Sequence, residues 1–393
     1  MINRILYIHN GSDLYGASRS LLRLVSRLDK ARFEPLVILP SQGPLAEALR
    51  VNGVRVTIMR SLAVISRTVF HSWKILTFLF MVPLSAAVLV KFIRQNKIDL
   101  VHTNLGTVVS TGLAAKLARV PHIWHIRDSF HEYGSLWKLY SKYILWFSDK
   151  VICVSTPIAK QFHNDGGKVI VVHNGVPIEE FEGITEERTG AFRERFGLNN
   201  KRTVGVIGRI KFQRKGQDFF VKSIALLRKK REDVKYLIVG SSFPGNENHL
   251  HNLSKLINEL GLGDDIILTG DIEDIVAVYK TLDVLVLPSC QPEPFAGVVL
   301  EAMAIGTPVI GTRIGGTVEQ IEDGVSGILI EPNNTQMLAE KIELLLDDRD
   351  LFERIRRGAR RRVEENFRFE AMYGRLMGIY REVLTSQQES SSH

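Results

Sequence analysis

Cysteine is nearly absent from this 393-residue chain, which contains only Cys153 and Cys290. Two isolated cysteines provide neither a disulfide framework nor the closely spaced ligands of a structural zinc site. The composition therefore suits a reducing cytoplasm. The N-terminal sequence MINRILYIHN also lacks the basic, apolar and small-residue regions of a secretory signal. We expect this segment to be a buried strand and the protein to stay in the cytoplasm.

Acidic residues are outnumbered by basic ones, which gives a net charge of +8 and a pI near 9.4. Such a balance favours anionic partners: nucleic acid, phosphorylated small molecules or an acidic membrane surface. Basic runs lie at residues 228–231 and 354–362. We find no zinc-finger spacing, no aromatic RNA-binding strand and no basic coiled coil, so nucleic acid is not an expected partner.

Long hydrophobic runs are also lacking, apart from the uncharged segment 75–90. Its sixteen residues include Pro83 and fall short of the roughly 20 that span a bilayer. Two interpretations remain: a buried helix, or an apolar face that lies in the membrane interface with its basic flanks on anionic headgroups. We favour the interfacial helix, because Trp73, Phe78 and Phe80 add more apolar surface than one sheet face hides.

Short apolar runs alternate with helical patterns along nearly the whole chain. The runs lie at residues 4–10, 34–40, 54–59, 99–104, 122–128, 150–155, 169–174, 203–208, 235–240, 266–270, 283–288, 308–312 and 327–330. Apolar strands separated by helices indicate parallel sheets covered on both faces. The pattern predicts an α/β protein with two doubly wound, Rossmann-like domains that face a central cleft.

A polar stretch at residues 182–202 separates the two sets of runs. We therefore expect an N-terminal domain at 1–181 and a C-terminal domain at 200–365. A helical pattern at 366–385 is predicted to cross back and pack on the first domain. The polar tail at 386–393 is expected to be disordered.

Two carboxylates, Glu293 and Glu301, bracket a glycine-containing turn that follows the apolar run 283–288. A helix is predicted to begin between Phe295 and Gly297. Its first N–H groups lack intrahelical partners and carry the positive end of the helix dipole, which makes a site for phosphate. Gly297 permits close approach, and a carboxylate one turn later suits paired sugar hydroxyls. Each acid alone would be ordinary, but their combination with this turn favours function.

Two cations lie in a second predicted strand-to-helix loop. Arg209 comes just after the apolar run 203–208, and Lys215 just before a helical pattern. An Arg fork and a Lys point charge match the two negative charges of a pyrophosphate. Surface salt bridges are the alternative, but Lys211 and Arg214 add further positive charge with no acid beside them in the sequence.

With these motifs the sequence resembles the retaining glycosyltransferases of family 4, which have the two-domain GT-B fold. The matching stretches are EPFAGVVLE, GRIKFQRKGQDFFVKSIALL, GTPVIGTRIGG, VVHNGV and GASRSLL, and together they extend over nearly the whole chain. The resemblance implies a hexosyltransferase that takes a sugar from a nucleotide-diphosphate sugar, in bacterial polysaccharide or glycolipid biosynthesis.

The resemblance also implies roles in the second domain. Glu301 would bind the ribose hydroxyls, Glu293 the transferred sugar, and Arg209 and Lys215 the diphosphate, whose charge they would stabilise as it departs. The other implied donor contacts are Phe295, Ala296, Gly297, Val298 and Ile272, with Ile272 facing the base, and Gly315, Gly316 and Thr317 near the diphosphate. The resemblance requires no metal, and the single Asp-x-Asp match, at 348–350, lies in a polar link.

In the first domain the resemblance nominates Gly16, in a glycine-rich loop near the diphosphate. Tyr15 stands where the family often has another glycine. His125 would be presented to the reaction centre, with Arg127 and Asp128 beside it, and His102 ranks second. A packed core histidine is the alternative for each. Two further residues, His173 and Asn174, resemble the interdomain hinge.

A retaining reaction passes either through a covalent intermediate or through front-side attack on a short-lived oxocarbenium ion pair. We favour front-side attack, in which a diphosphate oxygen takes the acceptor's proton, because no carboxylate is placed as a nucleophile. His125 would orient the donor sugar. We expect a membrane-held acceptor, such as a polyprenyl-diphosphate-linked glycan, and peripheral association with the inner face of the membrane. Two alternatives remain: a nucleotide-sugar epimerase of the same fold, and a non-catalytic basic module that binds membranes.

Overall fold

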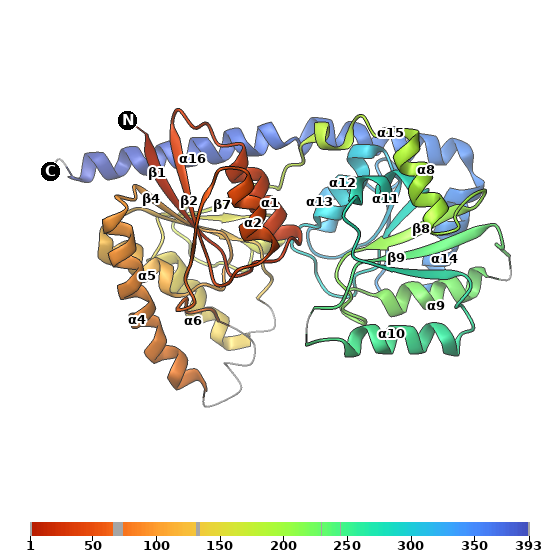
Figure 1. Ribbon diagram of the computed structural model, residues 1–393, viewed down its shortest axis with the longest axis horizontal. Coiled ribbons are helices and arrows are strands. Elements are labelled where there is room, and N and C mark those ends of the chain that lie inside the picture. The colour runs from red at the N-terminus through yellow and green to blue at the C-terminus, as the bar shows by residue number, and fades with distance from the viewer. Residues whose placement is uncertain (1, 66–73, 131–133, 229, 244, 392–393) are drawn as a thin grey trace. The chain divides into compact units, whose positions relative to one another are not determined.

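The computed structural model describes residues 2–65, 74–130, 134–228, 230–243 and 245–391. The chain divides into two compact units (Figure 1). The first unit comprises residues 1–173 and 372–393, and the second comprises residues 174–371. The boundary thus lies between His173 and Asn174, earlier than the polar stretch at 182–202 suggests.

The first unit contains a parallel seven-stranded sheet in the order β3-β2-β1-β4-β5-β6-β7. The strands are β1 (Asn3–Ile8), β2 (Phe33–Leu39), β3 (Arg55–Ile58), β4 (Leu100–Thr103), β5 (His122–Ile126), β6 (Lys150–Cys153) and β7 (Val169–Val171). Every predicted strand of this half is confirmed. Strand β1 pairs with both β2 and β4, so the order of the chain reverses there. Ligands of such sheets gather at this reversal, outside the carboxyl ends of the strands.

Helices cover both faces of this sheet. They are α1 (Gly16–Ser26), α2 (Pro44–Val51), α4 (Lys74–Gln95), α5 (Ser110–Ala118), α6 (Gly134–Trp146), the short α7 (Thr156–Ala159) and α16 (Phe369–Ser391). Because crossovers between parallel strands are right-handed, α1 and α2 cover one face, while α4, α5 and α6 cover the other. Figure 1 shows α4, α5 and α6 together below the strands.

The C-terminal helix α16 joins the first unit from Met372 onward, as the sequence predicts. It continues to Ser391, so residues 386–391 are helical and the expectation of a disordered tail is wrong for them. Each residue added to an existing helix gains a hydrogen bond, and Gln and Glu are good helix formers. Gln387 Nε2 also donates to the carbonyl of Arg119, at 2.9 Å.

The second unit contains a parallel six-stranded sheet in the order β10-β9-β8-β11-β12-β13. Its strands are β8 (Arg202–Ile207), β9 (Val234–Val239), β10 (Ile266–Gly270), β11 (Val284–Leu287), β12 (Val309–Thr312) and β13 (Ile328–Ile330). Its helices are α8 (Glu186–Arg195), α9 (Gln217–Leu227), α10 (Asn248–Glu259), α11 (Ile275–Thr281), α12 (Gly297–Ile305), α13 (Thr317–Gln320), α14 (Thr335–Asp347) and α15 (Arg349–Asn366). The predicted strands are again confirmed, and the reversal lies between β8 and β11.

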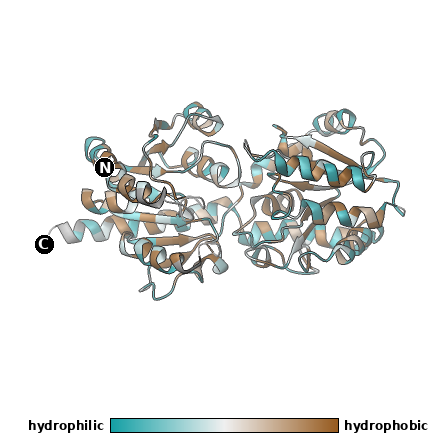
Figure 2. Ribbon diagram, turned by 90° about the horizontal axis from the view of Figure 1, so that it is seen from below, coloured by the Kyte–Doolittle hydropathy of each residue, from teal (hydrophilic) through white to brown (hydrophobic). Residues whose placement is uncertain are grey.

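Figure 2 shows both sheets mostly in the brown of apolar residues, while the helices carry a teal side and a brown side. This is the expected pattern for sheets that are buried on both faces. The core of the second unit, for example, joins Val206 of β8 and Val286 of β11 to Phe220 and Ile224 of α9.

The polar stretch at 182–202 is predicted to separate the two domains, but it contains helix α8, which belongs to the second unit. Phe192 is buried in the second unit. Arg188 donates to Asp274 at 2.8 Å, and Arg193 donates to the carbonyl of Leu198 at 2.7 Å. A single buried ring and long side chains that reach acceptors attach this helix, although its sequence is strongly polar.

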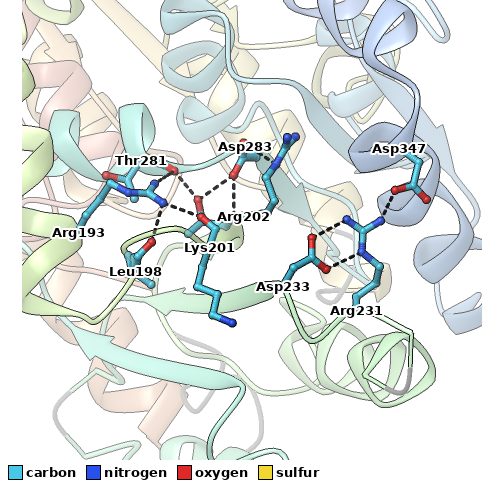
Figure 3. Close-up of polar contacts among 10 residues, drawn as sticks. Arg193, Leu198, Lys201, Arg202, Arg231, Asp233, Thr281, Asp283 and Asp347 are labelled. Atoms are coloured by element: carbon cyan, nitrogen blue, oxygen red, sulfur yellow. Dashed lines mark hydrogen bonds and ion pairs between the residues drawn. The ribbon is translucent and has the colours of Figure 1, made fainter.

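A polar network holds the amino ends of strands β8, β9 and β11 (Figure 3). Arg202 pairs with Asp283 at 3.0 Å, and Asp283 accepts a hydrogen bond from the Thr203 amide at 2.7 Å. Arg231 bonds both Asp233 and Asp347. The basic run at 228–231 therefore contributes ion pairs to the fold, at the end of the sheet away from the carboxyl ends of the strands.

Candidate functional site

The loops that follow β8 and β11 meet at the reversal of the second sheet. Lys215 Nζ donates to Glu293 Oε1 at 2.6 Å, and Ser289 Oγ donates to the same oxygen at 2.7 Å. The Lys215 side chain is 29% exposed and that of Glu293 is 13% exposed. The structure thus brings together one cation and one acid that the sequence places 78 positions apart.

Gly216 makes this approach possible. Its φ of +69° is in the left-handed region, and a Cβ atom there would lie 1.8 Å from the carbonyl oxygen of Pro288. The Cys290 amide donates to the carbonyl of Arg214 at 3.1 Å, which ties the two loops together. Backbone contacts therefore fix the positions from which Lys215 and Glu293 extend.

The charge state of Glu293 depends on its neighbours. Burial opposes ionisation, but the charge and hydrogen bond of Lys215 and the hydroxyl of Ser289 outweigh it, so the pKa of Glu293 is lowered. The carboxylate is ionised at neutral pH and neutralises Lys215. A phosphate that enters this site has a cation available, since Lys215 is partly exposed and can exchange one anionic partner for another.

Helix α12 begins at Gly297, as predicted, directly after the Glu293 loop. Its first N–H groups have no acceptor within the helix. The buried Gln320 holds the residue before it: the Ala296 amide donates to Gln320 Oε1 at 3.1 Å, and Gln320 Nε2 donates to the Ala296 carbonyl at 2.8 Å. A Cβ atom at Gly297 would meet no atom within 4 Å, so packing inside the structure does not require this glycine.

Gly315 and Gly316 have a different role. A Cβ atom on Gly315 would lie 2.4 Å from the carbonyl oxygen of Glu293, and one on Gly316 would lie 2.1 Å from that of Pro294. The Gly316 amide also donates to the Glu293 carbonyl at 2.7 Å. These glycines pack directly against the backbone of the Glu293 loop, so side chains at 315 and 316 would not fit. The expected contact of Gly315, Gly316 and Thr317 with the diphosphate remains a prediction.

Glu301 lies one turn into α12 and is only 5% exposed. Its Oε2 atom accepts a hydrogen bond from the hydroxyl of Tyr279, at 2.7 Å. Tyr279 is a site neighbour that the sequence does not single out. It fixes the carboxylate, and the binding of ribose hydroxyls by Glu301 remains a prediction.

Two further predicted donor contacts, Arg209 and Ile272, lie in loops of the second unit. The guanidinium carbon of Arg209, in the loop after β8, lies 5.0 Å from the centroid of the Phe243 ring. Gln217 Nε2 donates to the Arg209 carbonyl at 3.1 Å and so anchors the loop. Ile272 is half-buried in the loop after β10. Lys215 is the basic residue of the loop after β8 that donates to Glu293.

In the first unit, His125, Arg127 and His102 form a buried polar cluster at the carboxyl ends of β4 and β5. The rings of His102 and His125 lie 5.3 Å apart, and Arg127 Nη2 lies 3.5 Å from His125 Nδ1. A guanidinium only donates, so Nδ1 is an acceptor and the neutral ring carries its proton on Nε2. Within the described residues, His125 Nε2 is buried without a hydrogen-bond partner.

Both imidazoles are uncharged at neutral pH. Burial, reinforced by the positive charge of Arg127, lowers the pKa of His102 to about 3 and that of His125 well below its ordinary value. Arg127 remains charged, although burial lowers its pKa to about 10. The cluster therefore offers a neutral N–H donor next to a fixed cation.

Sequence reasoning missed the residues that hold this cluster. Arg127 Nε donates to Asn104 Oδ1 at 3.1 Å, and Asn104 Nδ2 lies 3.3 Å from His9 Nδ1. The Tyr380 hydroxyl of α16 lies 2.6 Å from His102 Nδ1. His9 and Asn104 follow β1 and β4, the two strands at the reversal, and polar residues at those strand ends are a signal that sequence analysis can use. Tyr380 is fully buried.

The loop before α1 continues the network. Asp13 Oδ1 accepts from the Tyr15 amide at 3.0 Å and from Ser18 Oγ at 3.2 Å, while Ser18 Oγ lies 3.0 Å from His9 Nε2. Tyr15 precedes the first residue of α1, Gly16, where a Cβ atom would meet nothing within 4 Å.

The remaining predicted residues lie apart from these two clusters or at their margins. Asp128 follows Arg127 and is half-buried. His173 and Asn174 stand at the boundary of the two units. Asp348 caps helix α15 by accepting from the Leu351 amide at 2.8 Å. In the part of the chain that the structure describes, no group of three or more His, Cys, Asp or Glu side chains is placed to hold a metal ion.

The fold defines a two-unit α/β protein in which two loops pair a cation with an acid. Two family models match the chain: glycosyltransferase family 4 at residues 15–180, and glycosyl transferases group 1 at residues 189–362. Together they extend over most of both units. The chain therefore belongs to the family 4 glycosyltransferases, as its motifs predict.

Individual relatives agree with this assignment. The alpha-D-kanosaminyltransferase of Streptomyces kanamyceticus is 33% identical over 201 residues, which are 51% of this chain and 50% of that protein. An uncharacterized glycosyltransferase of Methanocaldococcus jannaschii is 28% identical over 73% of this chain and 76% of its own length. The chain thus spans about half the length of the first of these curated relatives and about three quarters of the second.

Solved structures resemble the whole chain. HepE from Anabaena, in complex with UDP-glucose, has a TM-score of 0.83 at 22% identity and covers 96% of this chain and 99% of its own. A glycosyltransferase from Rickettsia africae has a TM-score of 0.81 at 25% identity, covering 98% and 99%. These similarities confirm the predicted GT-B fold.

Proposed function

We propose that this protein is a glycosyltransferase that moves a sugar from a nucleotide-diphosphate sugar to an acceptor. The observation that carries the proposal is the Lys215–Glu293 pair, 2.6 Å apart at the sheet reversal and next to the amino end of α12. A cation, a helix start and an acid at one point suit the diphosphate and hydroxyls of an activated sugar. The complex of HepE with UDP-glucose supports this choice of donor.

Donor binding would rearrange the charges of this site. A diphosphate takes the place of Glu293 as the partner of Lys215, with Arg209 and the first N–H groups of α12 as further donors. Glu293, still held by Ser289, then accepts hydrogen bonds from the transferred sugar. Glu301, whose carboxylate Tyr279 holds at 2.7 Å, binds the ribose hydroxyls. As the glycosidic bond breaks, these fixed positive groups stabilise the departing diphosphate.

We further propose a retaining and metal-independent reaction. Two cations and a helix terminus compensate the diphosphate charge, so the chemistry does not need a divalent ion. His125 is a poor general base because its pKa is strongly lowered, but its Nε2–H can donate to a sugar oxygen. The acceptor proton then goes to a diphosphate oxygen while the acceptor attacks the same face of the sugar.

The proposed acceptor is a glycan or lipid held in a membrane, which the protein meets as a cytoplasmic, peripherally attached enzyme. The net charge of +8 and the exposed apolar residues of α4 support this choice.

The test is to incubate the purified protein with a panel of nucleotide sugars and lipid-linked acceptors, with excess chelator, and to determine the anomeric configuration by NMR. We expect transfer with retention in the presence of chelator. Inversion of configuration, or recovery of activity only when a divalent ion is added back, contradicts the mechanism. Conversion of the donor's stereochemistry without acceptor identifies an epimerase instead.

A further inference from the structure

Helices α4, α5 and α6 share one face of the first sheet and have an unusual charge content. Their sequences contain no Asp or Glu, in a chain that has 43 acidic residues. Exposed cations on or just after them are Lys91, Arg94, Lys116, Arg119, Lys138 and Lys142. These three helices therefore carry a single sign of charge, which attracts anionic surfaces.

The same helices expose large apolar side chains. Leu79 and Phe80 of α4 are 59% and 69% exposed, and Leu139 and Trp146 of α6 are both 70% exposed. Along α4, the residues Phe80, Leu84, Val88 and Lys91 follow one another at helical spacing on one stripe. Such a stripe, apolar at one end and basic at the other, is typical of helices that lie in a membrane interface.

The opposite side of α4 is fixed in the protein core. Leu89 and Ile93 are buried together with strand residues of β1 and β4. Ser85 Oγ donates to Ser110 Oγ at 2.8 Å and accepts from the Ala63 amide at 3.2 Å. These contacts hold the helix against the sheet and leave only one side of it for an external partner.

This packing also decides whether α4 lies on a bilayer or crosses it. The charge-free run of sixteen residues is too short to span a bilayer. Helix α4, however, has 22 residues, and its segment Thr77–Gln95 is long and apolar enough by length and composition. Length is therefore not the obstacle that the sequence suggests. The obstacle is the fold, because a spanning helix would have to withdraw Leu89 and Ile93 from the core.

Several of the exposed apolar residues lie toward the carboxyl edge of the sheet, whereas Trp146 ends α6 away from it. In a crossover between parallel strands, the helix begins at the carboxyl edge of the sheet. Leu79 and Phe80 are near the start of α4, and Leu136 and Leu139 are near the start of α6. Arg127 follows β5 at the same edge. Figure 1 shows the starts of α4 and α6 extending below the strands.

We propose that this face, the α4–α6 surface, docks on an anionic lipid bilayer. It consists of the apolar residues Leu79, Phe80, Leu84, Leu139 and Trp146 and the cations Lys91, Lys138 and Lys142. The apolar side chains enter the headgroup region and the cations bind the anionic lipids. Presentation of a lipid-held acceptor to the His125 cluster rests on the proposed function, whereas attachment to the bilayer does not.

Vesicle flotation at low salt tests the docking. The probes are vesicles of phosphatidylcholine alone and vesicles with about 30% phosphatidylglycerol. The wild-type chain should float with the anionic vesicles, and high salt should weaken its binding. The double variant Phe80→Ser/Leu139→Ser should bind about tenfold more weakly or worse. The variant Lys138→Ala/Lys142→Ala should lose most of the dependence on phosphatidylglycerol.

Matched controls lie elsewhere on the protein. Val51→Ser is the apolar control, because Val51 of α2 is 85% exposed. Arg354→Ala/Arg357→Ala is the basic control, because both arginines are exposed on α15. These variants should float like the wild type. Circular dichroism melts verify that each variant is folded, which is expected because only exposed side chains change.

The proposal fails if the wild type stays in the soluble fraction, or if the α4–α6 variants float as the wild type does. It also fails if gel filtration shows a dimer that only the Phe80→Ser/Leu139→Ser variant abolishes, because a second copy of the chain then covers the face. Nucleotide binding is measured in parallel. Intact nucleotide binding without flotation rejects the docking alone, and flotation without nucleotide binding rejects the proposed function alone.

Discussion

The two units use the same topological position for opposite electrostatic purposes. At the reversal of the second sheet, a partly exposed Lys215 pairs with an ionised Glu293. At the corresponding reversal of the first sheet, His102 and His125 are buried and uncharged. The first arrangement can exchange an internal partner for a charged ligand. The second keeps two neutral rings in place beside the charged Arg127. Under the proposed function, the first unit would orient the donor sugar and the second would bind its anionic diphosphate.

The largest effect should come from breaking the charged pair. In Lys215→Ala, the buried Glu293 loses its partner and the donor loses a cation, so we expect transfer to fall about 10²–10³-fold. Lys215→Arg should restore part of it. Steady-state kinetics with the preferred nucleotide sugar measure the change, and a thermal melt shows whether the fold persists. Activity of a folded Lys215→Ala protein within a few fold of the wild type contradicts the assignment.

The His125 cluster should respond differently. His125→Ala removes a single N–H donor without changing the charge of the site, so kcat should fall about 10²-fold while nucleotide affinity changes little. His125→Asn, which retains a donor, serves as the conservative control. The comparison between the units breaks down if His125→Ala weakens nucleoside diphosphate binding as strongly as Lys215→Ala does.

The fold was largely predictable from sequence because buried parallel strands are continuous apolar runs, and every predicted run became a strand. The boundary was less predictable. Residues 182–202 are polar, yet Phe192 and the side chains of Arg188 and Arg193 attach α8 to the second unit. Composition does not show such attachment, since it depends on where a few long side chains find acceptors.

The motifs of the site were predictable from the sequence, whereas the residues that hold those motifs in place were not. Lys215, Glu293 and Glu301 lie in recognisable loops, but Tyr279 and Gln320 contact the site from other elements. Hydrogen bonds between residues distant in sequence have no local pattern. Tyr380 is the extreme case, since its hydroxyl reaches His102 across 278 positions of the chain.

A moderate effect should appear in the pH dependence of stability, and it belongs mainly to the first unit. Burial lowers the pKa values of His9 and His122 to about 4 and that of His102 to about 3, below the ordinary 6.5. Below pH 6.5 the unfolded chain therefore binds more protons than the folded chain. The stability contributed by the neutral rings is complete above pH 6.5 and is lost as the pH falls toward 4 and 3.

Urea unfolding at pH 7, 6 and 5 measures this loss, which should be about 1.4 kcal/mol per histidine for each pH unit below 6.5. A His102→Gln variant should show a flatter decline than the wild type. An unfolding free energy that stays constant from pH 7 to 5 contradicts the assignment of buried, neutral histidines.

The smallest effect should come from Tyr380 of α16, whose hydroxyl holds His102 in place. Tyr380→Phe removes the hydroxyl that bonds His102, so we expect a loss of about 0.5–1.5 kcal/mol in the free energy of unfolding and a modest decrease in kcat. Tyr373→Phe is the matched control, because its hydroxyl bonds the exposed Asp29 amide of the same unit. Equal effects of the two variants on kcat show that Tyr380 does not act through His102.

Calorimetric titration with nucleoside diphosphates decides most directly whether the charged pair of the second unit holds the donor. The full-length wild type and the Lys215→Ala variant are each titrated with a panel of nucleoside diphosphates and with the matching nucleosides. We expect the wild type to bind one diphosphate, the variant to bind it at least about tenfold more weakly, and the nucleosides to bind poorly to both. Equal affinity of the two proteins for the diphosphate contradicts the proposed donor site.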